Sequence, residues 1–259
     1  MQRQTAVDFA HLLPGSLGAW MSTRAGGCSA PPWDSFNLGD HVGDDSSHVR
    51  ANRRWLADAI GVRPVFLQQV HGTQVLELGE ATPDGAVADA CFTFDRGLAC
   101  TIMVADCLPV LLWDEQGRWV AAAHAGWRGL AGSDGHGVLE SLWAALAARG
   151  AQPAHTRVWL GPCIGPQAFE VGPEVRQAFC AHTPEAASAF VAGPGDRWLA
   201  DLQALARSRL REIGLSAIAG NDGQEDWCTV SRPALFFSHR RDAARLGSTG
   251  RMAACIWRR

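Results

Sequence analysis

Three side chains capable of metal binding or nucleophilic chemistry lie where predicted strands meet bends. His71 begins the bend HGTQ, Cys107 follows Ala-Asp before an apolar run, and His124 interrupts a row of alanines. Thiolate and imidazole are natural ligands of Zn²⁺, at roughly 2.0–2.3 Å, and three protein ligands leave a fourth position for water or substrate. The spacings of 36 and 17 residues are not those of a short zinc finger, so the fold would have to bring the ligands together. Taken one at a time, such residues are more often packed or hydrogen-bonded side chains than ligands.

The same atoms also suit nucleophilic catalysis. Cys107 could act as a nucleophile with His124 as its base. Asp106 could then orient an imidazole or activate a water molecule. The alternative for Asp106 is a hydrogen bond to nearby backbone at a strand end, which is common for aspartate.

Anion binding in this chain would depend on arginine and on backbone N–H groups. All 23 basic residues are arginine, and the sequence has no lysine and no tyrosine. A lysine Schiff base, a Walker A lysine and a tyrosine acid, base or nucleophile are therefore excluded. The arginines in or beside Gly/Ser-rich segments are Arg24, Arg128, Arg240, Arg241 and Arg251. The segment HAGWRGLAGSDGHG also runs into a predicted helix N-terminus, which favours an anion, although most arginines are solvated surface charges.

Length and composition favour a globular protein without nucleic-acid or membrane partners. The 259 residues suit one large domain, and a hydrophobic share of 47% is enough for a sizeable core. A net charge of −3 gives no reason to expect nucleic acid or a membrane surface as a partner. The first residues contain no apolar core of a signal peptide, and no window approaches a membrane span. We therefore expect a cytoplasmic protein whose eight cysteines are thiols.

Hydrophobic periodicity and turn residues predict the elements that must position these side chains. Helices are expected over about 47–60, capped by Ser46 or Ser47 and ended by Gly61, over about 135–149, from Pro173, and over about 199–213. Strands are expected over 64–70, 75–78, 91–94, 98–105, 109–114, 118–125, 157–161, 228–230, 235–241 and 251–258.

Two of the predicted turns join neighbouring strands. The bend 71–74 would return the chain beside 64–70, and a turn at 115–117 ends in Gly117, where a three-residue hairpin favours a left-handed residue. Short hairpins interleaved with helices predict an α/β (α+β-like) fold with mixed or antiparallel sheets. No linker or repeat divides the chain, so we expect a single domain over residues 1–259.

Ten segments, taken in order, resemble one known family. They are STRAGGCS, FNLGDHVGDD, VRANRRWL, QQVHGTQV, VADACFTF, ADCLPVLL, AAAHAGWRG, GPCIGPQAFEVG, WCTV and FFSHRRD…TGRMA. Together they are similar to the YfiH/YlmD family, whose members are described variously as laccase-like polyphenol oxidases, purine nucleoside phosphorylases and peptidoglycan editing factors. The resemblance runs from about Ser22 to Ala253 and departs at the closing motif, where His239 and an insertion precede TGRMA.

The resemblance implies a fold and a set of site residues. The fold would be a layered α-β-β-α domain related to putative cysteine hydrolases. The metal ligands would be His71, Cys107 and His124, with Cys107, His124 and Asp106 as catalytic residues. Apart from the resemblance, Arg24, Arg128 or Arg240 could hold phosphate, and Asn37 is a further candidate for binding the substrate. The hairpin would bring ADC and HAGWRG together, and QVHG would supply the third ligand.

The implied activities are phosphorolysis of adenosine, inosine and methylthioadenosine, and deamination of adenosine. The partners would be a purine nucleoside and phosphate, and the chain would be a monomer or a homodimer. An open zinc site accounts for deamination, because zinc makes water more reactive near neutral pH. Phosphorolysis also needs arginines that converge on phosphate.

Three other functions remain to be weighed. A hydrolase that edits a cell-wall precursor could use the same zinc or the Cys107 thiolate. A multicopper oxidase is rejected, because such enzymes share paired H-x-H ligands and this chain has nine histidines and no H-x-H. Copper could still replace zinc at a thiolate-imidazole site, since Cu²⁺ ranks above Zn²⁺ in affinity. The non-enzymatic alternative is a zinc-stabilised binding or assembly protein.

Overall fold

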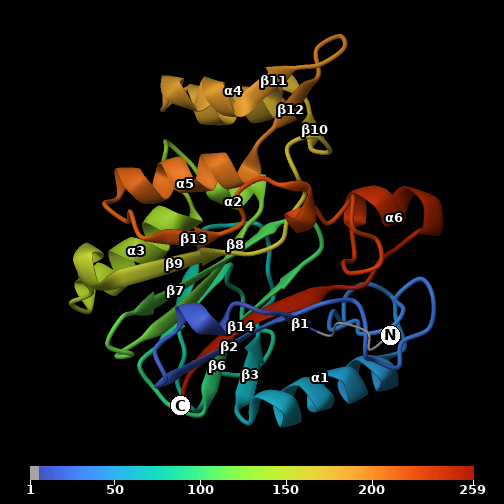
Figure 1. Cartoon of the computed structure of the whole chain (residues 1–259), viewed down its shortest axis with the longest axis vertical. Coiled ribbons are helices and arrows are strands. Elements are labelled where there is room, and N and C mark those ends of the chain that lie inside the picture. Colours follow the sequence, from blue (N-terminus) through green and yellow to red (C-terminus); the bar gives the residue numbers. More distant parts are fainter. Residues whose placement is uncertain (1–5) are drawn as a thin grey trace.

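Two β-sheets pack face to face and carry helices on their outer faces (Figure 1). The structure is a computed structural model and describes residues 6–259. One hydrophobic cluster lies between the sheets, a second lies between the six-stranded sheet and its helices, and a third lies between the five-stranded sheet and α1 (Ser46–Ile60). The layers therefore follow the implied order α-β-β-α, with mixed sheets. The relation to putative cysteine hydrolases stays a prediction.

The six-stranded sheet contains the hairpin that leads to Cys107 and His124. Its order is β13-β9-β7-β8-β5-β4, with parallel pairs at the two ends and antiparallel pairs between them. The strands are β4 (Val75–Glu77), β5 (Ala90–Thr93), β7 (Leu108–Asp114), β8 (Val120–Ala125), β9 (Thr156–Leu160) and β13 (Ile218–Gly220).

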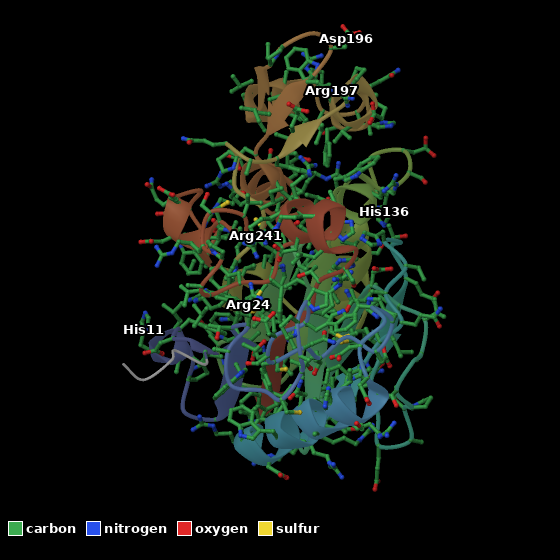
Figure 2. All side chains as sticks on the ribbon, turned by 90° about the vertical axis from the view of Figure 1, so that its right-hand side faces the viewer. His11, Arg24, His136, Asp196, Arg197 and Arg241 are labelled. Carbon is green, nitrogen blue, oxygen red and sulfur yellow. The ribbon has the colours of Figure 1, made fainter. Side chains whose placement is uncertain are left out.

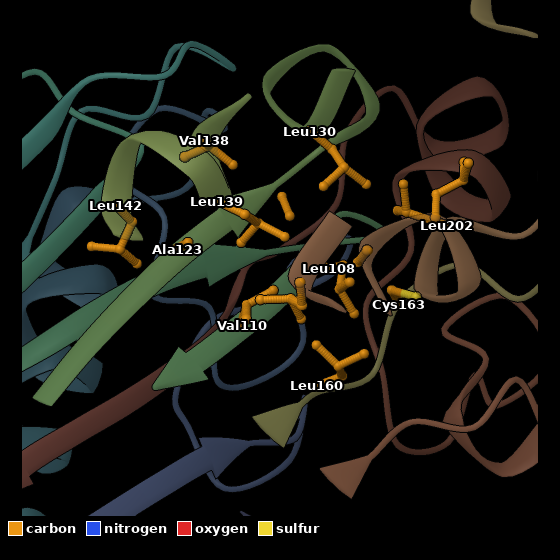
Figure 3. Packing of buried hydrophobic residues seen from close by; sticks show 14 of the residues in the cluster. Leu108, Val110, Ala123, Leu130, Val138, Leu139, Leu142, Leu160, Cys163 and Leu202 are labelled. Atoms are coloured by element: carbon orange, nitrogen blue, oxygen red, sulfur yellow. The ribbon is translucent and has the colours of Figure 1, made fainter. Parts of the chain in front are cut away.

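The strands β7 and β8 are buried along their whole length. One face meets the other sheet, and the opposite face meets α3 (Val138–Ala148). Figure 3 shows Val110 and Ala123 of this sheet beside Leu139 of α3. A strand covered on both faces needs a continuous apolar run, which is the pattern of both segments.

The five-stranded sheet contains strands from both ends of the chain. Its order is β1-β2-β14-β6-β3, and β3 pairs with β6 in parallel. The strands are β1 (Ala6–Val7), β2 (Leu17–Ser22), β3 (Arg63–Phe66), β6 (Leu98–Val104) and β14 (Met252–Arg258). A third, small sheet, with the order β10-β12-β11, lies with α4 (Pro173–Cys180) at one end of the molecule (Figure 1). Its strands are β10 (Glu170–Val171), β11 (Phe190–Ala192) and β12 (Trp198–Ala200).

The other helices are shorter than α1, and one of them, residues 202–212, packs in the same hydrophobic cluster as α3 on the outer face of the six-stranded sheet. They are α2 (Trp127–Ala131), α5 (Leu202–Glu212) and α6 (His239–Leu246), with 3-10 turns at Ala10–Leu12, Pro153–His155, Pro184–Ala189 and Glu225–Trp227. No helix within residues 6–259 combines the length and apolar character needed to cross a membrane. All eight cysteines are free thiols, as expected.

The helix boundaries partly differ from those expected from the sequence. Helix α1 buries Val49, Leu56 and Ile60 and ends at Gly61, which has a φ of 72°. Its N-cap is Asp45, whose carboxylate accepts the Ser47 N–H at 2.7 Å, so the prediction of Ser46 or Ser47 is wrong. The helix begins at Ser46, and the side chain of the preceding residue, Asp45, is the one that accepts the free N–H of Ser47.

Three strand predictions are also wrong. The segment 228–230 forms an isolated bridge from Cys228 to Cys163 followed by a turn. The segment after the bend, β4, does not return beside β3, because β4 pairs with β5 in the other sheet. The segment 235–241 is a turn followed by the start of α6, where the Ser238 hydroxyl accepts the Arg241 N–H. The helix expected over about 199–213 begins at Leu202, because Asp201 caps it and Trp198–Ala200 forms a strand.

Candidate metal centre

The β7–β8 hairpin brings Cys107 and His124 to the same end of the sheet. Pro109 lies opposite His124 in the register, and Cys107 comes directly before β7. The bend after β3 adds His71, whose Nε2 lies 3.7 Å from the Cys107 Sγ. The ligand atoms of the three residues all lie within 4.8 Å of one another. The predicted convergence through the fold is therefore confirmed.

The donor set and its spacing fit a tetrahedral ion. With metal–ligand distances of roughly 2.3 Å for sulfur and about 2.0–2.1 Å for nitrogen, a tetrahedral ion places sulfur and nitrogen about 3.5 Å apart. The separation of 3.7 Å between Cys107 and His71 is close to this value. Within residues 6–259, no second group of three or more His, Cys, Asp or Glu side chains is close enough to hold an ion. Three ligands leave a coordination position open to the adjacent cavity.

Asp89 holds two of the three ligands in place. It is fully buried, and its carboxylate accepts a hydrogen bond from the His124 Nδ1 at 2.8 Å. The same carboxylate accepts the backbone N–H groups of Val70, His71 and Gly72 at 3.1, 2.9 and 2.7 Å. The first contact leaves His124 Nε2 as the nitrogen for an ion, which is the usual arrangement around a metal-binding histidine. Asp89 was not among the site residues expected from the sequence, although it lies within the motif VADACFTF.

The backbone at the centre is unusually constrained. His71 has a φ of 60° and Asp106 a φ of 89°, both in the left-handed region that non-glycine residues seldom adopt. A positive φ has a conformational cost at His71. The Asp89 carboxylate offsets it by accepting hydrogen bonds from three successive N–H groups. A Cβ on Gly126 would lie 2.8 Å from the His71 ring and 3.0 Å from the Cys107 sulfur, so only glycine fits beside the ligands.

The charges of Cys107 and His124 stabilise each other. Burial by itself raises the pKa of Cys107, but the imidazoles of His124 and His71 outweigh it and lower this pKa to about 6. Burial lowers the pKa of His124, but the Cys107 thiolate and the Asp89 carboxylate raise it to about 9. Between these values the metal-free pair is a thiolate and an imidazolium, and the thiolate is the form that binds a metal ion.

We expect metal-free protein to be alkylated at Cys107 by iodoacetamide with a midpoint near pH 6. An ordinary thiol has its midpoint about 2.5 pH units higher, near its pKa of about 8.5. Peptide mapping by mass spectrometry separates Cys107 from the exposed Cys28. Stoichiometric zinc should suppress the reaction at Cys107 and spare Cys28. A midpoint above pH 8 for Cys107 would contradict the ion pair.

Asp106 lies beside the centre, but its carboxylate has other partners. The Thr229 hydroxyl donates to one oxygen at 2.5 Å, and the Arg240 backbone N–H donates to the other at 2.6 Å. The Asp106 carbonyl accepts the Ile164 N–H. These contacts join three loops around the metal ligands, and the carboxylate that holds an imidazole is that of Asp89.

A cavity of about 270 Å³ opens over the three ligands. Its lining is His41, Gln69, His71, Met103, Val104, Ala105, Asp106, Cys107, His124, Ile164, Phe169, His239, Arg240 and Arg251. Of the residues expected to bind substrate and phosphate, Arg240 is part of this lining. The sequence analysis did not single out His41, Gln69 and Phe169, although the first lies in the motif FNLGDHVGDD.

The other three residues expected to bind substrate and phosphate do not line this cavity. The Arg24 guanidinium pairs with Asp34 and donates to the Pro233 carbonyl. Asn37 is buried and accepts the backbone N–H of Arg251 at 2.8 Å. Arg128 is exposed on α2 and stacks on the Trp127 ring.

Arg24 and Arg241 have a shared structural role. Both guanidinium groups donate to carbonyls of the segment 229–237, which leads from the Thr229 contact into α6. Figure 2 labels the two side chains. Arg241 donates to the carbonyls of Thr229, Val230 and Phe236 and pairs with Asp242. The segment in turn carries Arg240 to the cavity.

Comparison with known proteins identifies close relatives over nearly the whole chain. The sequence profile of the family described as multi-copper polyphenol oxidoreductase laccase matches residues 18–259. A purine nucleoside phosphorylase of Pseudomonas aeruginosa is 49% identical over 247 residues, covering 94% of each chain. The purine nucleoside phosphorylase YfiH of Escherichia coli strain K12 is 47% identical over 246 residues, covering 94% of this chain and 95% of the relative.

Solved structures show the same fold. A Neisseria meningitidis protein assigned to the family DUF152 is 42% identical and superposes with a TM-score of 0.86, covering 98% of each chain. YlmD from Geobacillus stearothermophilus is 32% identical with a TM-score of 0.84, covering 95% of this chain and 93% of that one.

Proposed function

Because the chain belongs to the YfiH/YlmD family of laccase-like proteins, we propose that it is a zinc-dependent purine nucleoside phosphorylase. Its substrates would be adenosine, inosine and methylthioadenosine. The observation that carries the proposal is the His71, Cys107 and His124 centre, which opens into a cavity with arginines on its wall. A volume of about 270 Å³ is near the lower limit for ligand pockets and suits a nucleoside-sized molecule.

The proposed reaction joins a nucleoside and phosphate. An oxygen of hydrogen phosphate forms a bond to the ribose C1′, and the C1′–N9 bond breaks with its electron pair going to the purine. The proton lost by hydrogen phosphate ends on the purine, so the products are the free base and ribose 1-phosphate. The enzyme must hold both reactants in line and stabilise the charge of the leaving purine.

The chain supplies the positioning for this reaction. His71, Cys107 and His124 would hold Zn²⁺, which supplies Lewis-acid activation of a water molecule or a substrate group. Asp89 fixes the ring orientation and tautomer of His124. Phe169, 8% exposed, offers an apolar surface of the kind on which a purine packs. Arg240 donates to the carbonyls of Ala168 and Glu170, which reduces the conformational freedom that it would lose on binding an anion.

Deamination of adenosine is proposed as a second reaction of the same centre. It needs activated water and no phosphate, and the open coordination position favours it. Copper stays an alternative metal, because the family is described as a copper oxidoreductase and a thiolate-imidazole site accepts Cu²⁺. A hydrolase that edits a cell-wall precursor would use the same open centre. An assay of nucleoside breakdown distinguishes that activity from the nucleoside phosphorylase.

We expect zinc-loaded protein to convert adenosine to adenine in proportion to added phosphate, and to form some inosine whether or not phosphate is present. Chromatography of nucleoside and base, with ribose 1-phosphate measured separately, checks the stoichiometry. Heat-denatured protein in the same buffer is the control. The proposal fails if adenosine, inosine and methylthioadenosine all stay intact. Release of an amino acid from a UDP-linked muropeptide precursor in that same preparation would establish the editing hydrolase instead.

A further inference from the structure

The cavity that contains the metal ligands is also lined by two arginines, Arg240 and Arg251, that lack a carboxylate partner among the described residues. The ion pairs between described residues do not include Arg240 or Arg251. Elsewhere in the chain, partly buried arginines such as Arg209 and Arg241 pair with a carboxylate at 2.7 Å. A cation withdrawn from water needs a compensating charge or strong hydrogen bonds. This requirement falls on Arg251, which is partly buried, whereas Arg240 is exposed. Both guanidinium groups can accept an anion, because neither pairs with a carboxylate among the described residues.

Arg251 is held rigidly in this position. Its backbone N–H donates to the Asn37 side chain at 2.8 Å, and its Nη1 donates to the carbonyls of Thr249 and Gly250. The Arg251 Cγ lies so close to Gly39 that a Cβ there would come within 2.7 Å of it. These contacts use the backbone, the stem and one nitrogen of Arg251, and within the described residues no hydrogen bond engages its Nε or Nη2. Those two nitrogens form the fork that binds oxyanions with two parallel hydrogen bonds.

The charges around Arg251 leave the wall positive. Burial lowers the pKa of Arg251, and the nearby charges of Cys107 and Asp106 oppose this effect. Asp106 keeps its negative charge, because its partners, the Thr229 hydroxyl and the Arg240 N–H, are neutral, but the two guanidinium groups of Arg240 and Arg251 exceed that single charge. A bound metal ion would neutralise the Cys107 thiolate. Burial lowers the pKa of His41, Arg251 lowers it further, and Asp40, which lies 3.5 Å from His41, opposes them. Arg53 also lowers the pKa of His41, so two guanidinium groups act on this side of the cavity.

We propose that Arg251, assisted by Arg240 and the exposed His41 and His239, forms the anion subsite of this cavity and that its ligand is inorganic phosphate. The choice of phosphate as the anion rests on the proposed function. In this proposal phosphate binds at Arg251 and not at Arg24, Asn37 or Arg128. Arg251 is the central member, because it is the least exposed of the four and is fixed by its own backbone contacts.

The shared cavity explains why the anion and the metal ion belong to one reaction. Phosphate at Arg251 and Arg240 and a metal ion at His71, Cys107 and His124 would share one small volume of about 270 Å³. A nucleoside entering this volume meets both. Arginine stays charged at all working pH values, so the subsite offers a permanent double hydrogen-bond donor to the phosphate oxygens.

The test measures phosphate binding without turnover. Zinc-loaded protein is titrated with inorganic phosphate in the absence of nucleoside and followed by ³¹P line broadening. Arg251→Gln should weaken binding roughly ten- to a hundred-fold, the effect of losing charge-assisted hydrogen bonds. Arg251→Lys should retain an intermediate affinity, because the charge remains and the fork is lost. The matched control is Arg128→Gln, which removes an exposed arginine outside the cavity and should bind phosphate as the parent protein does.

The outcomes separate the subsite from the proposed function. Unchanged phosphate affinity in Arg251→Gln, with thermal unfolding and zinc content matching the parent, overturns the subsite even if phosphorolysis occurs. Binding that depends on Arg251 in a protein that leaves every nucleoside intact supports the subsite and refutes the phosphorylase. Equal competition by acetate would make the wall a general anion site and overturn the assignment to phosphate. Absence of saturable binding to the parent protein also overturns it.

Discussion

Cys107→Ser should yield a folded protein that has lost tight metal binding and nearly all activity. Four-ligand zinc sites have apparent binding free energies of about 10–16 kcal/mol, so one ligand contributes roughly 3 kcal/mol or more, a factor of at least about a hundred in affinity. Serine is close to cysteine in size, and the side chain is partly exposed, so the fold should tolerate the change. Elemental analysis after dialysis against a weak chelator measures the metal, and the nucleoside assay measures the activity.

Cys28→Ser is the matched control for this experiment. Cys28 is an exposed thiol that lies outside the cavity lining, so its loss should change neither the metal content nor the rate. Retention of one tightly bound metal equivalent by Cys107→Ser would remove the thiolate from the ligand set. Full activity in the metal-free parent protein would remove the metal ion from the reaction.

Asp89→Asn should damage both the metal centre and the fold, because one carboxylate organises four hydrogen-bond donors. The asparagine oxygen can accept one pair of donors, but its NH₂ group would then face the other pair, such as the Val70 and Gly72 N–H groups. Changes to the groups that support metal ligands typically cost 10–100-fold in metal affinity or activity. Leaving buried donors unpaired costs about 1–3 kcal/mol each, so the melting temperature should fall by several degrees.

The pKa of Asp89 adds a dependence on pH. Burial raises this pKa, but His124 and the backbone N–H groups outweigh burial and leave it below 3.8. A carboxyl group whose pKa is lowered by folding stabilises the fold above its unfolded pKa, and this stabilisation is lost as the pH falls through the folded value. The difference in stability between the parent and Asp89→Asn should therefore be full at pH 7 and shrink in strong acid.

Asp114→Asn separates damage to the centre from general destabilisation. Asp114 is a buried carboxylate at the far end of β7, where it pairs with Arg118 and accepts backbone N–H groups. Its loss should lower the melting temperature and leave the zinc affinity unchanged. If Asp89→Asn lowers stability by the same amount and keeps the parent's zinc affinity, Asp89 has a structural role alone.

The hairpin that joins Cys107 and His124 is predictable from the sequence for a local reason, whereas His71 reaches them only through the fold. The apolar runs of β7 and β8 and the turn at Gly117 fix the register of that hairpin, and the register places Cys107 near His124. Thiolate and imidazole donors then limit the chemistry, whatever the rest of the fold does. The buried face of α1 is predictable on the same grounds, because its apolar spacing repeats within one helix.

The anion wall and the support of the metal centre depend on contacts that no local pattern contains. Arg24 is diverted to the Pro233 carbonyl, 209 residues away, and Asn37 fixes the backbone of Arg251, 214 residues away. In the sequence, Asp89 is an ordinary residue before a strand. Its role arises because the fold places both the bend at His71 and the end of β8 next to its carboxylate. Residue types and short-range spacing therefore determined which donor atoms the protein has. Only the tertiary structure decided which arginines face the metal ligands, because side-chain direction follows from packing between segments that are distant in the sequence.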